Sequence, residues 1–225
     1  MINSVIEREL MLSGAVTVGF ADVKCVLKPE IAYLEKAISI GVDRNLNEDS
    51  VRLLISLEKR AVSILKSAGH RYLCIPPDSD RINNTFVSKL YPLISHKAAA
   101  TSAGLGWVGK NGLLISPEYG PRLSLATVLT DAPFATGIPV EFSMCGDCNL
   151  CKEFCPSGAI TGWEWSRLDP YVKLISADRC GPHKKKSRAL NGKPNCGLCV
   201  NICPYGRKDY KNSVAQEEPL VYNGA

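Results

Sequence analysis

The chain has 225 residues and a formal net charge of +5, and 45% of its residues are hydrophobic. This length suits one medium-sized domain plus a smaller one, and the apolar content is sufficient for a packed core and excludes a disordered chain. No apolar run approaches the ~18 residues of a membrane-spanning helix, and no basic-then-apolar signal segment opens the sequence. We therefore expect a cytoplasmic protein without membrane contact, in which ten cysteines indicate metal or redox chemistry rather than disulfides.

The first third of the chain alternates predicted helices and strands. Apolar and charged residues recur at helical spacing over residues 1–12, and a β-rich segment follows at 15–20. An early proline predicts a second helix over 29–41. The longest periodic segment, 48–68, predicts a third helix, and a short strand follows at 72–75. These elements predict an α/β layer that carries no chemistry of its own.

Two cysteines of this region, Cys25 and Cys74, lie in apolar contexts. Free cysteine is among the most frequently buried residue types. We therefore expect both thiols to be buried and structural.

A glycine-rich segment occupies the middle of the chain. It follows a predicted helix over 96–103 and precedes predicted strands at 113–116 and 123–130, which a turn over 117–121 joins. Four glycines within nine residues allow the backbone to approach a neighbour closely or to adopt positive φ.

The glycine spacing fits neither common nucleotide-binding motif. Gly109-Lys110 is followed by Asn111 rather than Ser or Thr, so the segment is not a phosphate-binding loop. It does match G-x-G-x-x-G, but the element before it is a predicted helix rather than the strand that a dinucleotide site requires. The glycines alone therefore identify no ligand.

Two cysteine runs follow, and each ends in proline. The first, Cys145–Pro156, has the spacing C-x2-C-x2-C-x3-C-P, and the second, Cys196–Pro204, has C-x2-C-x3-C-P. The first spacing is that of bacterial ferredoxins, in which three cysteines hold one 4Fe–4S cluster and the fourth binds the other. The second run lacks one upstream cysteine, which Cys180 supplies if residues 181–195 form an excursion loop.

This interpretation divides eight ligands between two 4Fe–4S clusters. One set is Cys145, Cys148, Cys151 and Cys203, and the other is Cys155, Cys180, Cys196 and Cys199. Structural zinc is the main alternative, although zinc sites do not usually need a third cysteine or a Cys-Pro end in both halves. A disulfide knot would need an oxidising compartment.

The glycine-rich segment and the cysteine runs, taken together, resemble the epoxyqueuosine reductase family, cobalamin-dependent enzymes of queuosine-tRNA synthesis. The stretch Ala103–Asn111 (AGLGWVGKN) precedes a two-cluster module in the family's order. Residues Leu114–Arg122 (LISPEYGPR) and Val128–Asp131 (VLTD) are also similar to reductive dehalogenases. The resemblance covers about residues 88–206.

The resemblance implies an α+β fold with two domains. A nitroreductase-like α/β cofactor-binding domain, residues 1–135, precedes a bacterial-type ferredoxin domain with two 4Fe–4S clusters, residues 136–210, and a tail, residues 211–225. In the family, the glycine-rich segment and its neighbours hold base-off cobalamin against the proximal cluster. The matching positions here are Gly104, Gly106, Trp107, Gly109, Lys110, Asn111, Tyr119, Gly120 and Arg122.

The chain departs from the family at the implied proton donor. The family's proposed donor is an aspartate in an Asp-Thr-Gly-Pro context, and the matching position here is Lys89. Lys89, His96 and Tyr119 are therefore the candidates by residue type. The helical-repeat extension that helps full-length members bind tRNA has no counterpart after Cys203, so we expect a small-molecule substrate or a corrinoid partner and leave tRNA open.

Two features near the cysteine runs lie outside these motifs. We expect Trp163 and Trp165 to pack the cluster module onto the larger domain, with shielding of a cluster edge as the alternative. The basic run His183–Arg188 is expected to be a solvated loop, with docking of an acidic electron donor or a nucleic-acid backbone as the alternative.

The sequence leaves open whether the chain is an enzyme. In the first hypothesis, two 4Fe–4S clusters accept electrons from a low-potential donor such as ferredoxin or flavodoxin and deliver them to bound cobalamin for reduction of a substrate. In the alternative, the chain is a non-catalytic electron-transfer or activator protein for a separate partner, which the missing aspartate favours. A flavin-binding reductase that uses FMN is a third hypothesis, supported by fold analogy alone.

Overall fold

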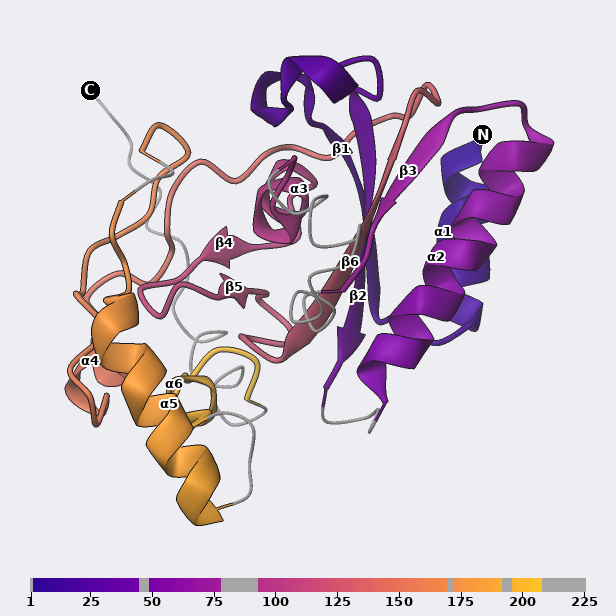
Figure 1. Cartoon of the computed structure of the whole chain (residues 1–225). Helices are drawn as coiled ribbons and strands as arrows, with labels where there is room; N and C mark the ends of the chain where they lie inside the picture. The colour runs from indigo at the N-terminus through magenta and orange to yellow at the C-terminus, as the bar shows by residue number, and fades with distance from the viewer. Residues whose placement is uncertain (1, 45–48, 78–92, 170–171, 192–195, 208–225) are drawn as a thin grey trace.

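The computed structural model describes residues 2–44, 49–77, 93–169, 172–191 and 196–207 (Figure 1). A four-stranded sheet in the order β1-β2-β6-β3 forms the centre of the larger part, and all neighbouring strands in it are antiparallel. The strands are β1 (Thr17–Asp22), β2 (Lys36–Asp43), β3 (Tyr72–Ile75) and β6 (Leu123–Thr130).

Two helices, α1 (Ile2–Leu12) and α2 (Ser50–Ser67), cover one face of this sheet (Figure 1). The Asp49 side chain caps α2 by accepting a hydrogen bond from the Arg52 amide, and Gly69 follows the helix with φ of 78°. The buried apolar residues of α2 recur every three or four positions, so one stripe faces the strands. They are Leu54, Leu57, Ala61 and Leu65.

The other face of the sheet receives a shorter helix, α3 (His96–Ser102), which Ser95 caps. Alternate residues of β2 point to opposite faces, and on the α3 side they are the small residues Ala37, Ser39 and Gly41. Ala37 packs with Ala99 of α3. Small side chains on both elements therefore allow this helix to lie close to the sheet.

A second body of structure lies beyond α3. The hairpin of β4 (Trp107–Val108) and β5 (Leu114–Ile115) separates α3 from the segment that carries the cysteine runs (Figure 1). That segment, the cluster module, has helices α4 (Leu150–Glu153), α5 (Ala177–Asn191) and α6 (Leu198–Asn201).

Most predicted elements are confirmed. The helices predicted over 1–12, 48–68 and 96–103 are α1, α2 and α3, and the strands predicted over 72–75 and 123–130 are β3 and β6. The remaining strand predictions match β1 and β5 with small shifts, and the chain between β5 and β6 makes the expected turn, with a bridge between Ser116 and Gly120. The structure is a mixed α/β fold with the cluster module attached, and its nitroreductase likeness stays a prediction.

The helix predicted over 29–41 is wrong. Only a 3-10 turn, η2 (Pro29–Ile31), forms there, after a similar turn η1 (Lys24–Val26), and the next element is the strand β2. Every residue of β2 from Ala37 to Asp43 is buried, because the strand lies inside the sheet with helices on both faces. A strand covered on both faces loses the two-residue alternation by which strands are recognised.

The predicted excursion loop is also wrong over most of its length. Residues 181–191 belong to α5, which begins at Ala177, although Pro182 lies inside it. Pro182 removes the hydrogen bond that the sixth residue of the helix would donate to the Asp178 carbonyl, and the helix continues past it. The predicted tail, 211–225, and the candidate Lys89 lie outside the described residues.

Candidate metal centre and adjoining cavity

Four cysteines of the cluster module line a common cavity. Cys145 and Cys148 lie in a turn closed by a hydrogen bond between their backbone groups, Cys151 lies on α4, and Cys203 follows α6. The four side chains line one small cavity together with Lys110, Asn111, Ile115, Pro204 and Tyr205. This first cysteine group has the donors that an iron–sulfur cluster uses.

Burial makes the thiols of this group reluctant to ionise on their own. Burial, together with the neighbouring sulfurs of Cys145, Cys203 and Cys148, raises the pKa of Cys151 to about 12. Burial likewise raises the pKa of Cys203 to about 11. Four thiolates at this site therefore need positive charge among them, such as cluster iron supplies.

The other four cysteines, the predicted ligands of the second cluster, are called here the second cysteine group. Burial raises the pKa of Cys199, and the charges of Cys180, Cys196 and Cys155 raise it as well. Burial also opposes ionisation of Cys155, but hydrogen bonds from Ser157 and nearby backbone amides outweigh it and lower the pKa of Cys155.

The charge of Cys199 also raises the pKa of Cys151 in the first group, so these pKa shifts do not divide the cysteines into two sets. The structure gathers the first set around one cavity, and the division of the eight cysteines into two ligand sets stays a prediction. Among the described residues, no three His, Cys, Asp or Glu side chains are arranged around a single metal-ion position.

Lys110 joins the hairpin to the first cysteine group. Only 5% of this residue is exposed, and its Nζ donates to the Gly146 carbonyl at 2.6 Å and to Asn149 Oδ1 at 3.3 Å. Glu164 Oε1 lies 3.6 Å from the same atom. A buried cation thus fixes the loop of Cys145 and Cys148, where four thiolates around a cluster core would leave a net negative charge.

Asn111 makes the matching connection to the second group. It is equally buried, and its side-chain nitrogen donates to the Cys199 carbonyl at 3.2 Å, while its oxygen accepts from the Leu113 amide. Two adjacent residues of the glycine-rich segment therefore fix one loop from each cysteine group.

The glycines of this segment face protein rather than open space. A Cβ on Gly106 would lie 2.1 Å from the Ile115 carbonyl oxygen, and one on Gly120 would lie 2.1 Å from the Tyr205 carbonyl oxygen. Gly104 meets the Ile138 carbonyl, and Gly109 and Gly112 meet isoleucine side chains. The density of glycine is thus explained by close packing, both between the two strands of the hairpin and between this segment and the residues that follow it.

Two larger side chains complete this junction. Trp107 is 2% exposed and packs edge-on against Tyr205 at 4.9 Å between ring centroids, in a cluster that includes Cys203. Its Nε1 is buried and has no hydrogen-bond partner among the described residues. The sulfur atoms of an iron–sulfur cluster can accept a hydrogen bond. The unpartnered Nε1 of Trp107 therefore fits a cluster bound to the first cysteine group. Arg122 donates to the Gly206 carbonyl at 2.6 Å.

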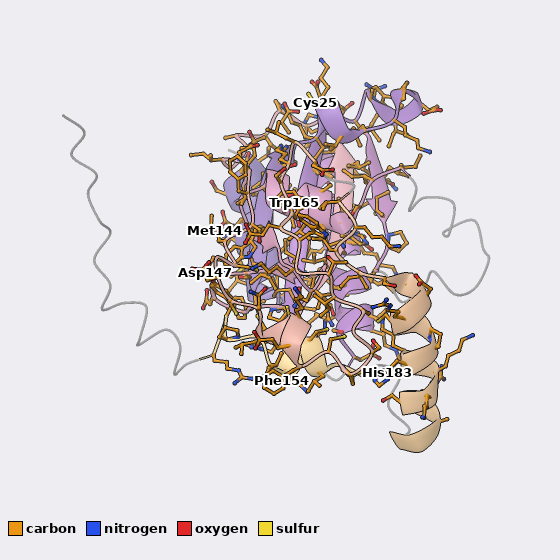
Figure 2. The ribbon with its side chains drawn as sticks, turned by 90° about the vertical axis from the view of Figure 1, so that its left-hand side faces the viewer. Cys25, Met144, Asp147, Phe154, Trp165 and His183 are labelled. Carbon is orange, nitrogen blue, oxygen red and sulfur yellow. The ribbon has the colours of Figure 1, made fainter. Side chains whose placement is uncertain are left out.

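A much larger cavity lies on the other side of the hairpin. Its volume is about 950 Å³, at the upper end of the roughly 300–1,000 Å³ typical of ligand and cofactor sites. It lies between the η1–η2 segment, α3 and part of the cluster module (Trp165, Arg167 and residues 172–175), and Figure 2 labels Cys25 and Trp165 from its lining. The described lining holds four cationic residues and no carboxylate: Lys28, Lys97, Arg167 and Lys173.

The turn after β4 contributes to both cavities. Val108 and Gly112 line the large cavity, whereas Lys110 and Asn111 line the cavity of the first cysteine group. A single hairpin turn therefore separates the two spaces.

The two described candidates for a proton donor lie away from the large cavity. His96 is 4% exposed, with Nδ1 2.8 Å from Thr127 Oγ1 and Nε2 2.9 Å from the Pro76 carbonyl. The carbonyl only accepts, so Nε2 carries the proton and the imidazole holds α3 against the sheet. Burial and the nearby Glu118 raise the pKa of Tyr119. Neither His96 nor Tyr119 is among the described residues that line the large cavity.

The cysteine and tryptophan expectations each hold in part. Cys74 is half-buried against the core, and this burial raises its pKa to about 12. Cys25 is exposed and lines the large cavity, so the prediction of a buried Cys25 is wrong. Cys25 lies on the η1 turn rather than in a strand, which leaves its thiol uncovered. Trp165 packs against Val108 and so joins the module to the hairpin, whereas Trp163 is 67% exposed.

Sequence reasoning missed the large cavity. Its residues come from three separated segments, and neither Lys97 nor Arg167 lies in a motif. Lys97 donates to the Gly112 carbonyl and Arg167 to Ser102 Oγ, contacts that only the folded chain reveals.

Comparison with known proteins supports the cluster assignment. Residues 144–206 match the 4Fe-4S double cluster binding domain family. The epoxyqueuosine reductase of Listeria monocytogenes is 35% identical over 117 residues, which cover 51% of this chain and 30% of that protein. The tetrachloroethene reductive dehalogenase of Desulfitobacterium hafniense is 33% identical over 145 residues, 56% of this chain and 25% of that protein. The resemblance seen in the sequence is thus confirmed, over less than a third of the relatives' length.

Solved structures of both kinds share the fold. An epoxyqueuosine reductase bound to an epoxyqueuosine-modified tRNA stem loop has a TM-score of 0.64 at 19% identity, covering 91% of this chain and 65% of that one. A reductive dehalogenase described as B12-dependent has a TM-score of 0.67 at 20% identity, covering 91% of this chain and 31% of that one. In the described part of the chain, no helix combines the length and apolarity needed to cross a bilayer.

Proposed function

We propose that this chain is an iron–sulfur redox protein that carries two 4Fe–4S clusters and binds cobalamin in the large cavity, where a substrate is reduced. One observation carries the proposal: a cavity of about 950 Å³ and the four-cysteine cavity lie on opposite sides of one hairpin turn. Electron transfer needs a short separation between donor and acceptor, and this turn keeps the separation short.

The lining of the large cavity supports a large, partly anionic cofactor. Val108, Trp165 and Leu174 supply apolar surface, and Lys28, Lys97 and Lys173 add positive charge. The fourth cation, Arg167, has its Nε 3.8 Å from the carboxylate of Glu141, which lies outside the described lining. Cobalamin has a broad apolar macrocycle and a phosphate in its nucleotide loop, so both kinds of surface find a match. When bound, cobalamin supplies the reductive chemistry, and the protein supplies position and electrostatics.

The chain's own residues hold the two sites in a fixed relation. Lys110 and Asn111 tie the loops of both cysteine groups to the hairpin. Arg167 and Lys97 make polar contacts across the large cavity, to Ser102 Oγ and to the Gly112 carbonyl. This support is what preorganised redox sites require, because small displacements change the transfer distance.

The glycine-rich segment takes a different role in this proposal from the one that the family resemblance implies. Gly106 and Gly109 allow the two strands of the hairpin to approach each other, and Gly104 and Gly120 allow close contact with Ile138 and Tyr205. Val108 and Gly112 are the parts of the segment that line the large cavity. The proposed cofactor contacts therefore move to η1–η2, α3, Trp165, Arg167 and residues 172–175.

Iron content tests the cluster half of the proposal. We expect anaerobically reconstituted wild-type protein to bind about eight irons, and Cys148→Ser and Cys199→Ser each to lose about half, because each removes a ligand from a different group. Cys25→Ser is the matched control and should keep the full content. Zinc instead of iron in protein purified anaerobically, or unchanged iron in both ligand variants, would contradict the assignment.

The non-catalytic carrier hypothesis makes the opposite prediction at the large cavity. A carrier that only passes electrons to a partner has no need of a bound corrin, and a flavin-binding reductase would bind FMN there instead. Binding of cobalamin or of FMN by the intact, cluster-loaded chain therefore separates the three hypotheses.

A further inference from the structure

The positive charge of the chain is concentrated on one helix. α5 carries five cationic residues and one carboxylate, so it holds +4 of the chain's formal +5. The cations are Arg179, Lys184, Lys185, Lys186 and Arg188, and the carboxylate is Asp178. All five cations are exposed.

Four of these five cations make no contact in the described part of the chain that would stabilise the fold. Lys184, Lys185, Lys186 and Arg188 have no ion pair or hydrogen bond with any other described residue. The helix projects from the rest of the molecule in both views, with His183 along its length (Figures 1 and 2). An isolated helix of 15 residues without an apolar face is marginally stable in water, so a partner of opposite charge would stabilise it.

The charged helix begins at the second cysteine group. Cys180, which belongs to the second cysteine group, lies in its first turn. At about 1.5 Å per residue, Lys184 to Lys186 follow Cys180 by roughly 6–9 Å along the axis. A protein that binds these lysines would therefore bring its own redox centre next to the second group.

We propose that α5 is the docking surface for a small, acidic, one-electron carrier protein that reduces the cluster of the second cysteine group. The inference rests on the two clusters of the proposed function but not on cobalamin. The carrier loses one electron and the cluster gains one, and no bond is made or broken. A nucleic-acid backbone would also be attracted by lysines, but it has no reason to bind where a cluster ligand begins the helix.

An acidic flavodoxin in its fully reduced form is a suitable probe. Its rate of electron transfer to the cluster-loaded chain is measured anaerobically by stopped flow, with dithionite as a small reductant that needs no docking. The test variant is Lys184→Glu/Lys185→Glu/Lys186→Glu. The control is Arg8→Glu/Lys59→Glu/Lys66→Glu, which changes the net charge equally at exposed residues of α1 and α2.

We expect the α5 variant to be reduced at least about tenfold more slowly by flavodoxin at low salt, because steered association gains 10- to 1,000-fold from complementary charge. The control variant should keep more than half of the wild-type rate, and dithionite should reduce all three proteins equally. The wild-type rate should fall as salt is added, while the rate of the α5 variant should not.

Equal slowing of both variants would attribute the effect to net charge and overturn the inference. So would an α5 variant that keeps the flavodoxin rate but loses binding of an RNA hairpin. Wild-type protein that takes up no iron would overturn the proposed clusters and this inference together. Clusters without cobalamin binding would contradict the proposed cofactor and leave the inference standing.

Discussion

Lys110 carries a charge that the fold buries at the edge of the first cysteine cavity. Its ammonium group is held by a carbonyl and an amide oxygen, with the partly exposed carboxylate of Glu164 at 3.6 Å. Burial of an ammonium group is costly unless charge or hydrogen bonds compensate it, and a cluster held by thiolates supplies negative charge on the cavity side. Lys110 therefore suits the first cysteine cavity to a negatively charged cluster.

Replacing Lys110 with Met should weaken retention of the first cluster. The change leaves the Gly146 carbonyl without its donor, and hydrogen bonds to charged groups are worth about 1.5–3 kcal/mol. We expect the cluster-loaded protein to lose about 2 kcal/mol of stability, measured as the urea dependence of cluster absorption under anaerobic conditions. Lys152→Met, at an exposed position of α4, is the control. Equal midpoints for the two variants would show that Lys110 does not support the site.

Gly106 tests the packing role of the glycine-rich segment. An alanine there would place its Cβ 2.1 Å from the Ile115 carbonyl, at a φ of 151° that side chains rarely adopt. We expect Gly106→Ala to cost at least about 3 kcal/mol in the free energy of unfolding, or to prevent folding.

Gly69→Ala gives the matched comparison, because a Cβ at Gly69 has no neighbour within 4 Å and only its positive φ is strained. It should cost about 1–2 kcal/mol. If both variants unfold at the same urea concentration, Gly106 does not pack tightly against the Ile115 carbonyl.

At the scale of elements, the predictable parts are those whose periodicity reflects a single buried face. α2 has one apolar stripe and a cap, and β3 is an edge strand, so both were predicted within two residues. β2 is buried on both faces, and most of it falls within residues 29–41, where the early proline predicts a helix. α5 has no apolar stripe at all, so its sequence gave only a charge pattern, which solvated loops share.

An ion pair that responds to pH lies at one end of the pairing between β6 and β3. The Arg71 side chain donates to Asp131 at 2.6 Å, and this hydrogen bond holds the pKa of Asp131 below its ordinary value. A carboxyl whose pKa is lower in the folded state stabilises the fold above its unfolded pKa of about 3.9 and loses that contribution as the pH falls through the folded value.

Asp131→Asn should therefore destabilise the protein by about 0.5–1 kcal/mol at pH 7, the upper part of the range for exposed pairs. The difference from wild type should shrink as the pH approaches 4, in urea unfolding followed by circular dichroism at pH 7, 5 and 4. Glu7→Gln, an exposed carboxylate on α1, should show no such trend. A gap that widens on acidification would contradict the assigned direction of the pKa.

At the scale of the whole molecule, the cysteine ligands could be predicted from the sequence, whereas the cofactor cavity could not. Ligand spacing within each cysteine run is local, so it identified eight candidate residues before any fold was known. Residues from η1–η2, α3 and the cluster module (Trp165, Arg167 and 172–175) form the large cavity together. These segments are far apart in the sequence, so no local pattern predicts that they adjoin. The family resemblance indicates the glycines instead, and the fold uses these for packing.

An anaerobic titration of the cluster-loaded chain with cobalamin, followed by absorption, is the most direct test of the central claim. We predict binding of one cobalamin per chain and a shift of the corrin spectrum to its base-off form. Ala98→Trp, which fills the cavity from α3, should weaken binding at least about tenfold with the iron content unchanged, whereas Ser63→Trp on the exposed side of α2 should bind normally. Full cluster absorption with no corrin response would contradict the account and leave an electron carrier or a flavoprotein.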